Sequence, residues 1–274
     1  MNIVKITKGI NIQVFSDLHI DLWDKIPRIH VLSKYLFLVG NICNINHRLF
    51  YKFFDFCSAN WIKIFYTPGN TEFYNTRKNF QELQFEYRHK LTGRYKNVFY
   101  LDNECIPLEG EIDVYGSVFW AYPNFTSTAE ANIYIPDYNS IRYFNHERNK
   151  IVKWDISHVK KISKESYFLL QNHLAKTTRT TIVMTHFPPI RSETFVKKHN
   201  RYPGEEVIIS NSSWKDETIS NFNVKHVPFW ISGHTHFSYN IEKNGCNFIS
   251  NQLGYKCELG TTNLDENAAF TFYQ

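Results

Sequence analysis

The chain has 274 residues, of which 43% are hydrophobic and 17% aromatic, and it carries a formal net charge of +5. This length suffices for one large α/β domain with a substantial core, or for two small domains. The mildly basic balance suits anionic partners, but no long run of lysine and arginine indicates a nucleic-acid groove. No apolar run reaches the roughly 18 residues of a membrane span. Lys5 and Lys8 interrupt the apolar residues near the N-terminus, unlike a secretion signal.

Cysteine usage indicates a reducing compartment. The five cysteines are odd in number and lack the short spacings of a zinc site; they are Cys43, Cys57, Cys105, Cys246 and Cys257. Free thiols explain them best. We therefore expect an intracellular protein, cytoplasmic or otherwise, with no membrane partner.

The first part of the chain alternates predicted strands and helices. Strands are expected over 11–16, 35–39 and 61–66, with helices over 47–58 and 77–91. Phe50, Phe53, Phe54 and Cys57 recur at the spacing of one helix face. Residues 35–39 are apolar throughout, as in a strand buried between layers. This alternation is typical of an α/β sheet.

The later part is predicted as further strands around one long helix. Short strands are expected over 97–101, 104–107 and 112–115, followed by an aromatic, strand-like segment over 116–122. Residues 123–140 are interpreted as an irregular surface excursion, 155–176 as a helix and 191–213 as a loop. The remaining predicted strands are 181–184, 226–231, 237–242 and 246–250. Since no linker divides the chain, we expect a single domain over residues 1–274.

Ligand-type side chains follow five of these strands directly. They are Asp17, His19, Asn41, Asn70, His186, His234 and His236. Each one alone is readily explained as a turn or loop residue. Because loops leaving strand carboxyl ends converge at one edge of an α/β sheet, the seven together predict a shared site.

Five short motifs give the chain a family resemblance. They are Ser16-Asp17-Leu18-His19, Gly40-Asn41, Pro68-Gly69-Asn70-Thr71-Glu72, Thr185-His186 and Gly233-His234-Thr235-His236. In this order they resemble the motifs of the calcineurin-like metallophosphoesterases. The resemblance implies an α/β fold, a double β-sandwich flanked by helices in four layers. It also implies a centre for divalent metal ions (Mn, Fe, Zn or Mg) that hydrolyses phosphoesters.

The family pattern assigns each ligand to one of two ions. It gives Asp17, His19 and His236 to one ion, and it gives Asn70, His186 and His234 to the other. A later segment, from Asp137 to Arg142, resembles one that lies near the site in a soluble branch of the family. Arg142 is a candidate contact for a phosphate group, with a surface salt bridge as the alternative.

Two positions depart from the family pattern. Asn41 stands where the family has an aspartate that bridges both ions, and Thr71 stands where it has a histidine that assists the leaving group. Two neighbouring cations repel strongly without a shared anionic oxygen, so one ion is favoured over two. A hydroxyl does not titrate near neutral pH, so Thr71 cannot replace an imidazole as an acid. Glu72 is either a spare carboxylate or a brace for its loop.

Two hypotheses follow for the function. The first is a pseudoenzyme or strongly impaired hydrolase that serves as a binding or structural module with an unknown protein partner. The second is an active phosphoesterase with one ion or an altered site, acting on a phosphoester substrate. The two departures together favour the first. Nucleic acid is an allowed partner that no motif indicates, and no catalytic residue is assigned.

Overall fold

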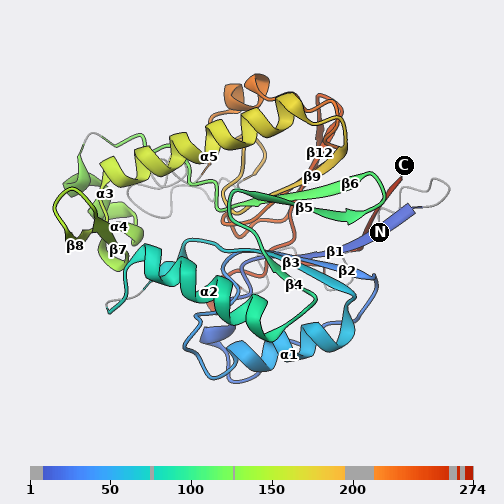
Figure 1. Ribbon diagram of the computed structural model, residues 1–274, viewed down its shortest axis with the longest axis horizontal. Coiled ribbons are helices and arrows are strands. Elements are labelled where there is room, and N and C mark those ends of the chain that lie inside the picture. Colours follow the sequence, from blue (N-terminus) through green and yellow to red (C-terminus); the bar gives the residue numbers. More distant parts are fainter. Residues whose placement is uncertain are drawn as a thin grey trace.

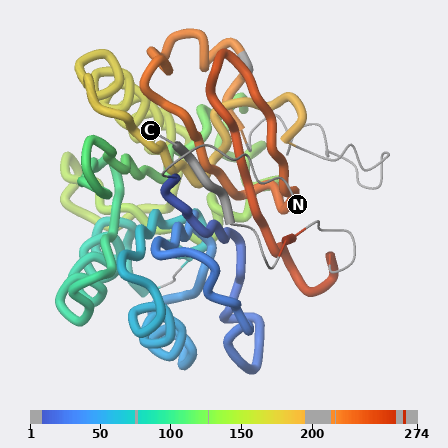
Figure 2. The backbone as a smooth tube through the Cα atoms, turned by 90° about the vertical axis from the view of Figure 1, so that its right-hand side faces the viewer, coloured from blue at the N-terminus to red at the C-terminus, as the bar shows by residue number. Residues whose placement is uncertain are grey.

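Two β-sheets packed face to face form the centre of the molecule, with helices on both outer sides (Figure 1). The computed structural model describes residues 9–74, 77–125, 127–194, 213–258, 264–265 and 269–273. The order of layers is helices, sheet, sheet, helix, so the predicted four-layer double β-sandwich is confirmed. Figure 2 views the layers from the side and shows that each sheet is built largely from one half of the chain.

The first sheet has the strand order β13-β1-β2-β3-β4. Its strands are β1 (Gly9–Phe15), β2 (Tyr35–Val39), β3 (Lys63–Thr67), β4 (Val98–Tyr100) and β13 (Ala269–Tyr273). The first four run parallel, and β13 pairs antiparallel with β1. Consequently β1, β2 and β3 all end at the same edge.

The second sheet has the order β11-β12-β10-β9-β6-β5. Its strands are β5 (Glu104–Glu109), β6 (Ile112–Ser117), β9 (Thr180–Thr185), β10 (Phe229–Ser232), β11 (Asn240–Lys243) and β12 (Cys246–Ile249). The four central strands are parallel, and the two outer ones are antiparallel. A separate hairpin pairs β7 (Arg142–Asn145) with β8 (Lys150–Lys153).

The two sheets bury an aliphatic and aromatic layer between them. Val14, Phe37 and Phe65 from the first sheet belong to the same buried cluster as Ile182 and Ile231 from the second. All five side chains are 0% exposed. Removing this apolar surface from water is the main force that holds the sheets together, and it fixes the relative position of the loops at their edges.

Helices cover the outer faces of the sheets (Figure 1). The α-helices are α1 (Phe50–Asn60), α2 (Phe80–Arg94), α3 (Thr128–Tyr134), α4 (Asp137–Ser140) and α5 (Ile156–Lys176). Short 3-10 turns are η1 (Ile20–Leu22), η2 (Thr71–Phe73), η3 (Asp216–Asn221) and η4 (Lys256–Glu258). Asn79 and Asp155 cap α2 and α5. The observed α5 agrees with the predicted helix over 155–176 to within one residue, whereas α2 begins three residues after the predicted start at residue 77.

The middle of the chain differs from the sequence-based expectation. The predicted strand over 116–122 is wrong, because β6 ends at Ser117 and Phe119 adopts a left-handed backbone with φ +55°. Residues 123–140 are not irregular throughout, since they contain α3 and α4. The signal for α3 is Ser127, whose side chain caps the helix at the Glu130 N–H. The hairpin β7–β8 and strand β13 were not predicted. Most of the predicted loop over 191–213 lies outside the described residues.

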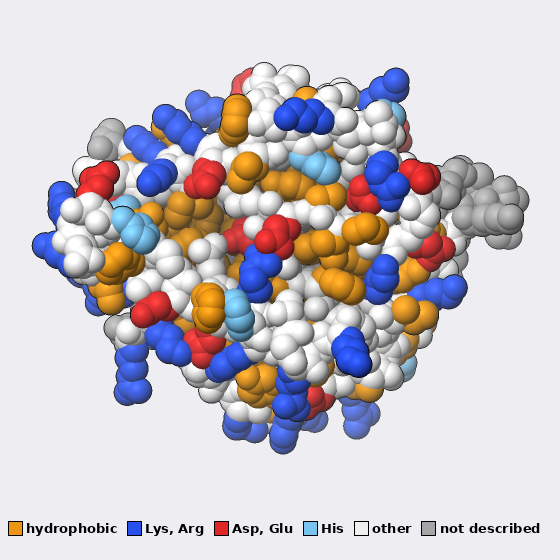
Figure 3. Space-filling view, in the orientation of Figure 1, with side chains coloured by type: hydrophobic (Ala, Val, Ile, Leu, Met, Phe, Trp, Pro, Cys, Tyr) orange, Lys and Arg blue, Asp and Glu red, His pale blue; other side chains and the backbone are white. Residues whose placement is uncertain are grey.

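Neither the described helices nor the charges on the face in Figure 3 indicate a membrane span or a nucleic-acid groove. In the part of the chain that the structure describes, no helix combines the length and the apolar character needed to cross a membrane. On the face drawn in Figure 3, lysine and arginine side chains lie scattered over the surface, interspersed with acidic and uncharged ones. This face therefore carries no continuous basic band of the kind that tracks a nucleic-acid backbone.

Candidate metal centre

The predicted ligands lie at the shared edge of the two sheets. Asp17 and His19 follow β1, Asn41 follows β2 and Asn70 follows β3. On the second sheet, His186 follows β9, and His234 and His236 follow β10. Direct contacts and hydrogen bonds link all seven residues into one connected group. The convergence expected from the strand ends is therefore present in the fold.

The backbone of this group is held in an uncommon conformation. Asp17 (φ 54°), His19 (φ 43°), Asn41 (φ 54°), His234 (φ 74°) and His236 (φ 55°) all adopt positive φ. The left-handed region costs roughly 1 kcal/mol or more for such side chains. Such strain persists only where the surrounding structure enforces it, and it is typical of functional sites.

Two glycines permit the close approach of the loops. At Gly40 (φ 81°) a Cβ atom would lie 2.3 Å from His186 Nδ1, and at Gly233 it would lie 2.0 Å from Ser16 Oγ. Neither separation is sterically possible, so only glycine lets the loops from the two sheets meet here. Steric crowding thus explains why glycine occupies positions 40 and 233 in the two motifs.

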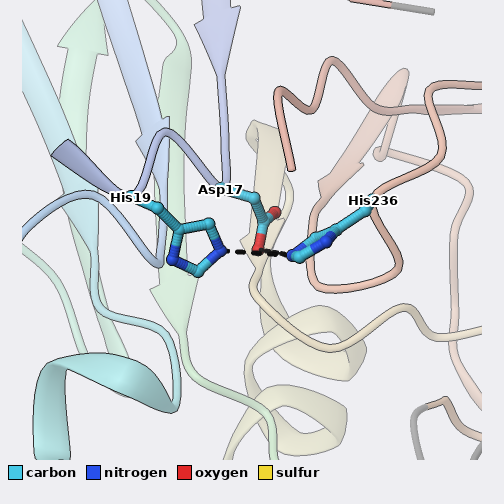
Figure 4. A group of neighbouring side chains, drawn as sticks. All are labelled: Asp17, His19 and His236. Carbon is cyan, nitrogen blue, oxygen red and sulfur yellow. Dashed lines mark hydrogen bonds and ion pairs between the residues drawn. The ribbon is translucent and has the colours of Figure 1, made fainter. Parts of the chain in front are cut away.

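The first ligand group consists of Asp17, His19 and His236 (Figure 4). Their ligand atoms all lie within 4.8 Å of one another. His19 Nε2 lies 3.2 Å from His236 Nε2, and the latter atom lies 3.5 Å from Asp17 Oδ1. Asp17 is 0% exposed and His19 is 3% exposed. One carboxylate and two imidazoles thus point at a common position.

The electrostatics of this group centre on a buried negative charge. Burial alone would raise the pKa of Asp17, but the hydrogen bond with His236 and the nearby imidazoles hold this pKa below its usual range. Burial lowers the pKa of His19 to about 4. Burial also opposes charge on His236, yet the carboxylates of Asp17 and Glu258 outweigh it and raise its pKa to about 9. Without an ion, the proton on His236 compensates the Asp17 charge.

The second ligand group contains Asn70, His186 and His234. His186 Nδ1 lies 2.9 Å from the Val39 carbonyl oxygen and therefore donates its proton there, which leaves Nε2 as a lone-pair atom. This Nε2 lies 3.1 Å from Asn70 Oδ1. Asn70 Nδ2 donates to Asp137 Oδ1 at 2.8 Å, so Oδ1 is the atom that faces the histidine. The lone pair of His186 Nε2 and a lone pair of Asn70 Oδ1 therefore face each other.

His234 completes this second group. Its Nδ1 atom is buried and has no hydrogen-bond partner among the described residues. The His234 ring centroid lies 5.1 Å from that of His186. An orphaned buried nitrogen is costly in a folded protein. Together with the facing lone pairs of His186 and Asn70, it makes an arrangement that a cation would satisfy.

The orientation of Asn41 separates the two groups chemically. Its Nδ2 donates to Asp17 Oδ1 at 3.0 Å. Its Oδ1 accepts from the Thr71 backbone N–H at 3.0 Å and from the Thr71 hydroxyl at 2.8 Å. The amide therefore presents protons to Asp17 and commits its oxygen to Thr71. It cannot supply the shared anionic oxygen that a bridging carboxylate would.

Glu72 serves as the brace of its loop. Its carboxylate accepts from the backbone N–H groups of Asn41, Ile42 and Gly69 at 2.9, 2.7 and 2.8 Å, and from the Tyr66 hydroxyl at 3.0 Å. Burial raises its pKa to about 7 against these hydrogen bonds. Because its oxygens are occupied by backbone donors, the brace interpretation holds and Glu72 is not a spare ligand.

Four residues of the site were not identified as site residues from the sequence. They are Asp137, Gln252, Tyr255 and Glu258. Asp137 holds the Asn70 amide, and Gln252 accepts from the His236 N–H at 2.6 Å. Tyr255 packs against both His19 and His236, with ring centroids 4.5 and 4.6 Å away. Of these four, only Asp137 lies in a segment named above as resembling the family, and that resemblance does not reveal its contact with Asn70.

Comparison with known proteins identifies the family. The family model for calcineurin-like phosphoesterases matches residues 10–238, and the chain belongs to this family. Protein L509 of Acanthamoeba polyphaga mimivirus, described as uncharacterized, is 27% identical over an alignment of 263 residues that covers 90% of this chain and 92% of that protein. The crystal structure of phosphopantetheinyl hydrolase (PptH) from Mycobacterium tuberculosis is similar with a TM-score of 0.64 at 14% identity, covering 97% of each chain. The latter likeness shows the fold alone.

The residues present fit the divalent ions that the family generally binds. Imidazole nitrogens with a carboxylate oxygen suit Zn²⁺, Fe²⁺ and Mn²⁺, and Mg²⁺ prefers oxygen ligands. The first group offers one full negative charge at Asp17. The second group offers neutral donors from Asn70, His186 and His234. The donor chemistry thus favours an ion at the first group.

Proposed function

We propose that this protein binds one divalent ion through Asp17, His19 and His236, and that it binds phosphoesters there with impaired hydrolysis. The ion would supply Lewis-acid polarisation of a phosphoryl oxygen and of water. The protein would orient the phosphate through its own side chains, with Arg142 at the start of β7 as a proposed contact. We propose further that residues 1–274 form a single domain that acts as a unit.

One observation carries the proposal, namely the orientation of the Asn41 amide. Its N–H group faces Asp17 Oδ1 at 3.0 Å, and Thr71 occupies its oxygen. Two divalent ions a few ångströms apart need a shared anion to offset their repulsion. Asn41 presents hydrogen atoms where that anion would be needed, which supports one ion rather than two.

The position of Thr71 supports impaired hydrolysis. Its hydroxyl donates to Asn41 Oδ1 at 2.8 Å and is therefore already engaged. A leaving alkoxide requires a proton from a group that titrates near the working pH. Thr71 has no such group, so leaving-group departure would depend on water or on another side chain.

The test is a metal count combined with a phosphodiesterase assay. Wild type, Asn41→Asp, Thr71→His and the double variant are reconstituted with Mn²⁺ and assayed on small phosphodiesters. We expect one ion per wild-type chain and little hydrolysis, with a second ion and higher activity in the double variant. Two ions per wild-type chain, or wild-type activity equal to that of the double variant, would contradict the proposal.

A second candidate is a competent phosphoesterase that also uses the second ligand group. It is favoured by the facing lone pairs of His186 Nε2 and Asn70 Oδ1 at 3.1 Å and by the buried Nδ1 of His234. It predicts that His186→Ala removes both an ion and most of the hydrolysis. If wild type neither binds an ion nor hydrolyses phosphoesters, the remaining function is that of a binding module for a protein partner.

A further inference from the structure

Glu258 contacts the ligand histidine from the side opposite the proposed ion. Its Oε2 atom lies 2.6 Å from His236 Nδ1, and the two side chains are 23% and 12% exposed. The same oxygen accepts from the Tyr255 backbone N–H at 2.8 Å. A deprotonated carboxylate can only accept hydrogen bonds. His236 Nδ1 therefore carries a proton, and its Nε2 is the atom left for an ion.

The rest of the geometry agrees with this division of the ring. His236 Nε2 points toward Asp17 Oδ1 and His19 Nε2, at 3.5 and 3.2 Å. On the other side, the His236 backbone N–H donates to Gln252 Oε1 at 2.6 Å. The ring is thus fixed by its backbone at one end and by Glu258 at the other. Neither contact blocks the atom that faces Asp17.

Glu258 also holds the aromatic cover of the first ligand group. Glu258 ends η4, and its carboxylate closes the turn back to the Tyr255 N–H. The Tyr255 ring packs on His19 with centroids 4.5 Å apart and meets His236 edge-on at 4.6 Å. A single carboxylate therefore fixes both a ligand ring and the ring that covers it.

The charge of Glu258 matters because the site has one carboxylate fewer than the family pattern, which has aspartate at position 41. Asn41 contributes no negative charge, and among the described residues Asp17 is the one carboxylate grouped with His19 and His236 at the ion position. A carboxylate that accepts the Nδ1–H of a ligand imidazole makes the opposite nitrogen a stronger donor and adds negative charge behind it. Glu258 is placed to do both.

We propose that Glu258 is a positioning residue for the divalent ion, fixing His236 with Nε2 toward it and supplying the second negative charge of the site. This inference rests on the proposed one-ion function and deepens it. A carboxylate behind the ligand histidine raises affinity typically tenfold to a hundredfold. Part of that gain comes from orientation and part from charge, and the two are separable.

The experiment measures Zn²⁺ and Mn²⁺ dissociation constants by calorimetry and by competition with a chromophoric chelator. Glu258→Ala removes both orientation and charge, and we expect affinity to fall about tenfold to a hundredfold. Glu258→Gln keeps a carbonyl acceptor without charge, and we expect an intermediate loss. Glu242→Gln on β11 removes the same charge from an exposed position and is the matched control, for which no change is expected.

A second measurement distinguishes positioning from general damage. With histidine labelled by ¹⁵N, the zinc-loaded wild type is expected to show a slowly exchanging Nδ1–H signal for His236. This signal should persist in Glu242→Gln and be lost in Glu258→Ala, while the circular dichroism of the ion-free forms stays alike.

The failures of the two proposals are distinguishable. A wild-type protein that binds no ion at neutral pH overturns the proposed function and this inference with it. A wild type that binds one ion, together with a Glu258→Ala variant of equal affinity and an unchanged His236 signal, overturns this inference alone. Loss of affinity in Glu258→Gln equal to that in Glu258→Ala would assign the whole effect to charge and contradict the orientation part.

Discussion

Replacing Asn41 by aspartate tests how the two ligand groups are separated. In wild type, Asn41 Nδ2 donates to Asp17 Oδ1 at 3.0 Å. Asn41→Asp removes this donor and sets two carboxylates against each other. At that separation, unit charges repel by about 5 kcal/mol with an effective dielectric constant near 20. The ion-free variant is therefore expected to be much less stable than wild type at pH 7.

The stability of Asn41→Asp is expected to depend on pH in a definite direction. Two neighbouring carboxylates raise the pKa of one of them, so the folded variant holds a proton that the unfolded chain releases. Its stability should then fall as the pH rises from about 5 to 8. At roughly 2–4 °C per kcal/mol for a chain of this size, the melting temperature at pH 7 should drop by on the order of 10 °C.

Metal ions should reverse the loss. A ligand present at a hundred times its dissociation constant stabilises the folded state by about 2.7 kcal/mol. We predict that Mn²⁺ or Zn²⁺ raises the melting temperature of Asn41→Asp more than that of wild type, because the second carboxylate then has a cation. The assay is differential scanning calorimetry with and without ions. Asn46→Asp, at an exposed position in the same loop, is the matched control.

Equal melting of ion-free wild type and Asn41→Asp between pH 5 and 8 would refute the reasoning. It would mean that the Asn41 amide does not face Asp17 in solution.

Four further predictions follow from the described contacts. Glu72→Ala leaves three buried backbone N–H groups without their acceptor, so chemical denaturation should show a loss of at least about 3 kcal/mol. His236 has a pKa of about 9 without an ion, so ion binding expels its proton and calorimetric affinity should rise about tenfold per unit between roughly pH 6 and 8. The same shift means that His236 stabilises the ion-free fold fully below pH 6.5 and loses this effect as the pH rises through about 9; a flat comparison with His236→Ala would contradict it. His186→Ala should leave one ion bound per chain in elemental analysis, and loss of that ion would assign it to the second group.

The sequence predicts the architecture well where periodicity and motifs agree. The buried strand β2 (Tyr35–Val39) was predicted with its observed bounds, because a strand apolar on both faces has few other structures available. The convergence of Asp17, Asn70 and His234 followed from their places after parallel strands. The segment after Ser117 was misread because aromatic residues favour strands, whereas here Phe119 turns the chain and packs into the core.

The finer chemistry of the site could not be read from the sequence. Which way the Asn41 amide points depends on Thr71 and Asp17, and these are brought together only by the folded loops. The contacts of Glu258 with His236 and of Asp137 with Asn70 join residues far apart in the chain. Neither residue lies in a ligand motif, so only the tertiary structure reveals its role.

Elemental analysis of the purified, reconstituted protein at neutral pH tests the central proposal most directly. Wild type is incubated with Mn²⁺ or Zn²⁺, freed of excess ion and compared with His236→Ala and Glu242→Gln. We predict one ion per chain for wild type and for Glu242→Gln, and essentially none for His236→Ala. Two ions per wild-type chain, or one ion that His236→Ala retains, would contradict the assignment of a single ion to Asp17, His19 and His236.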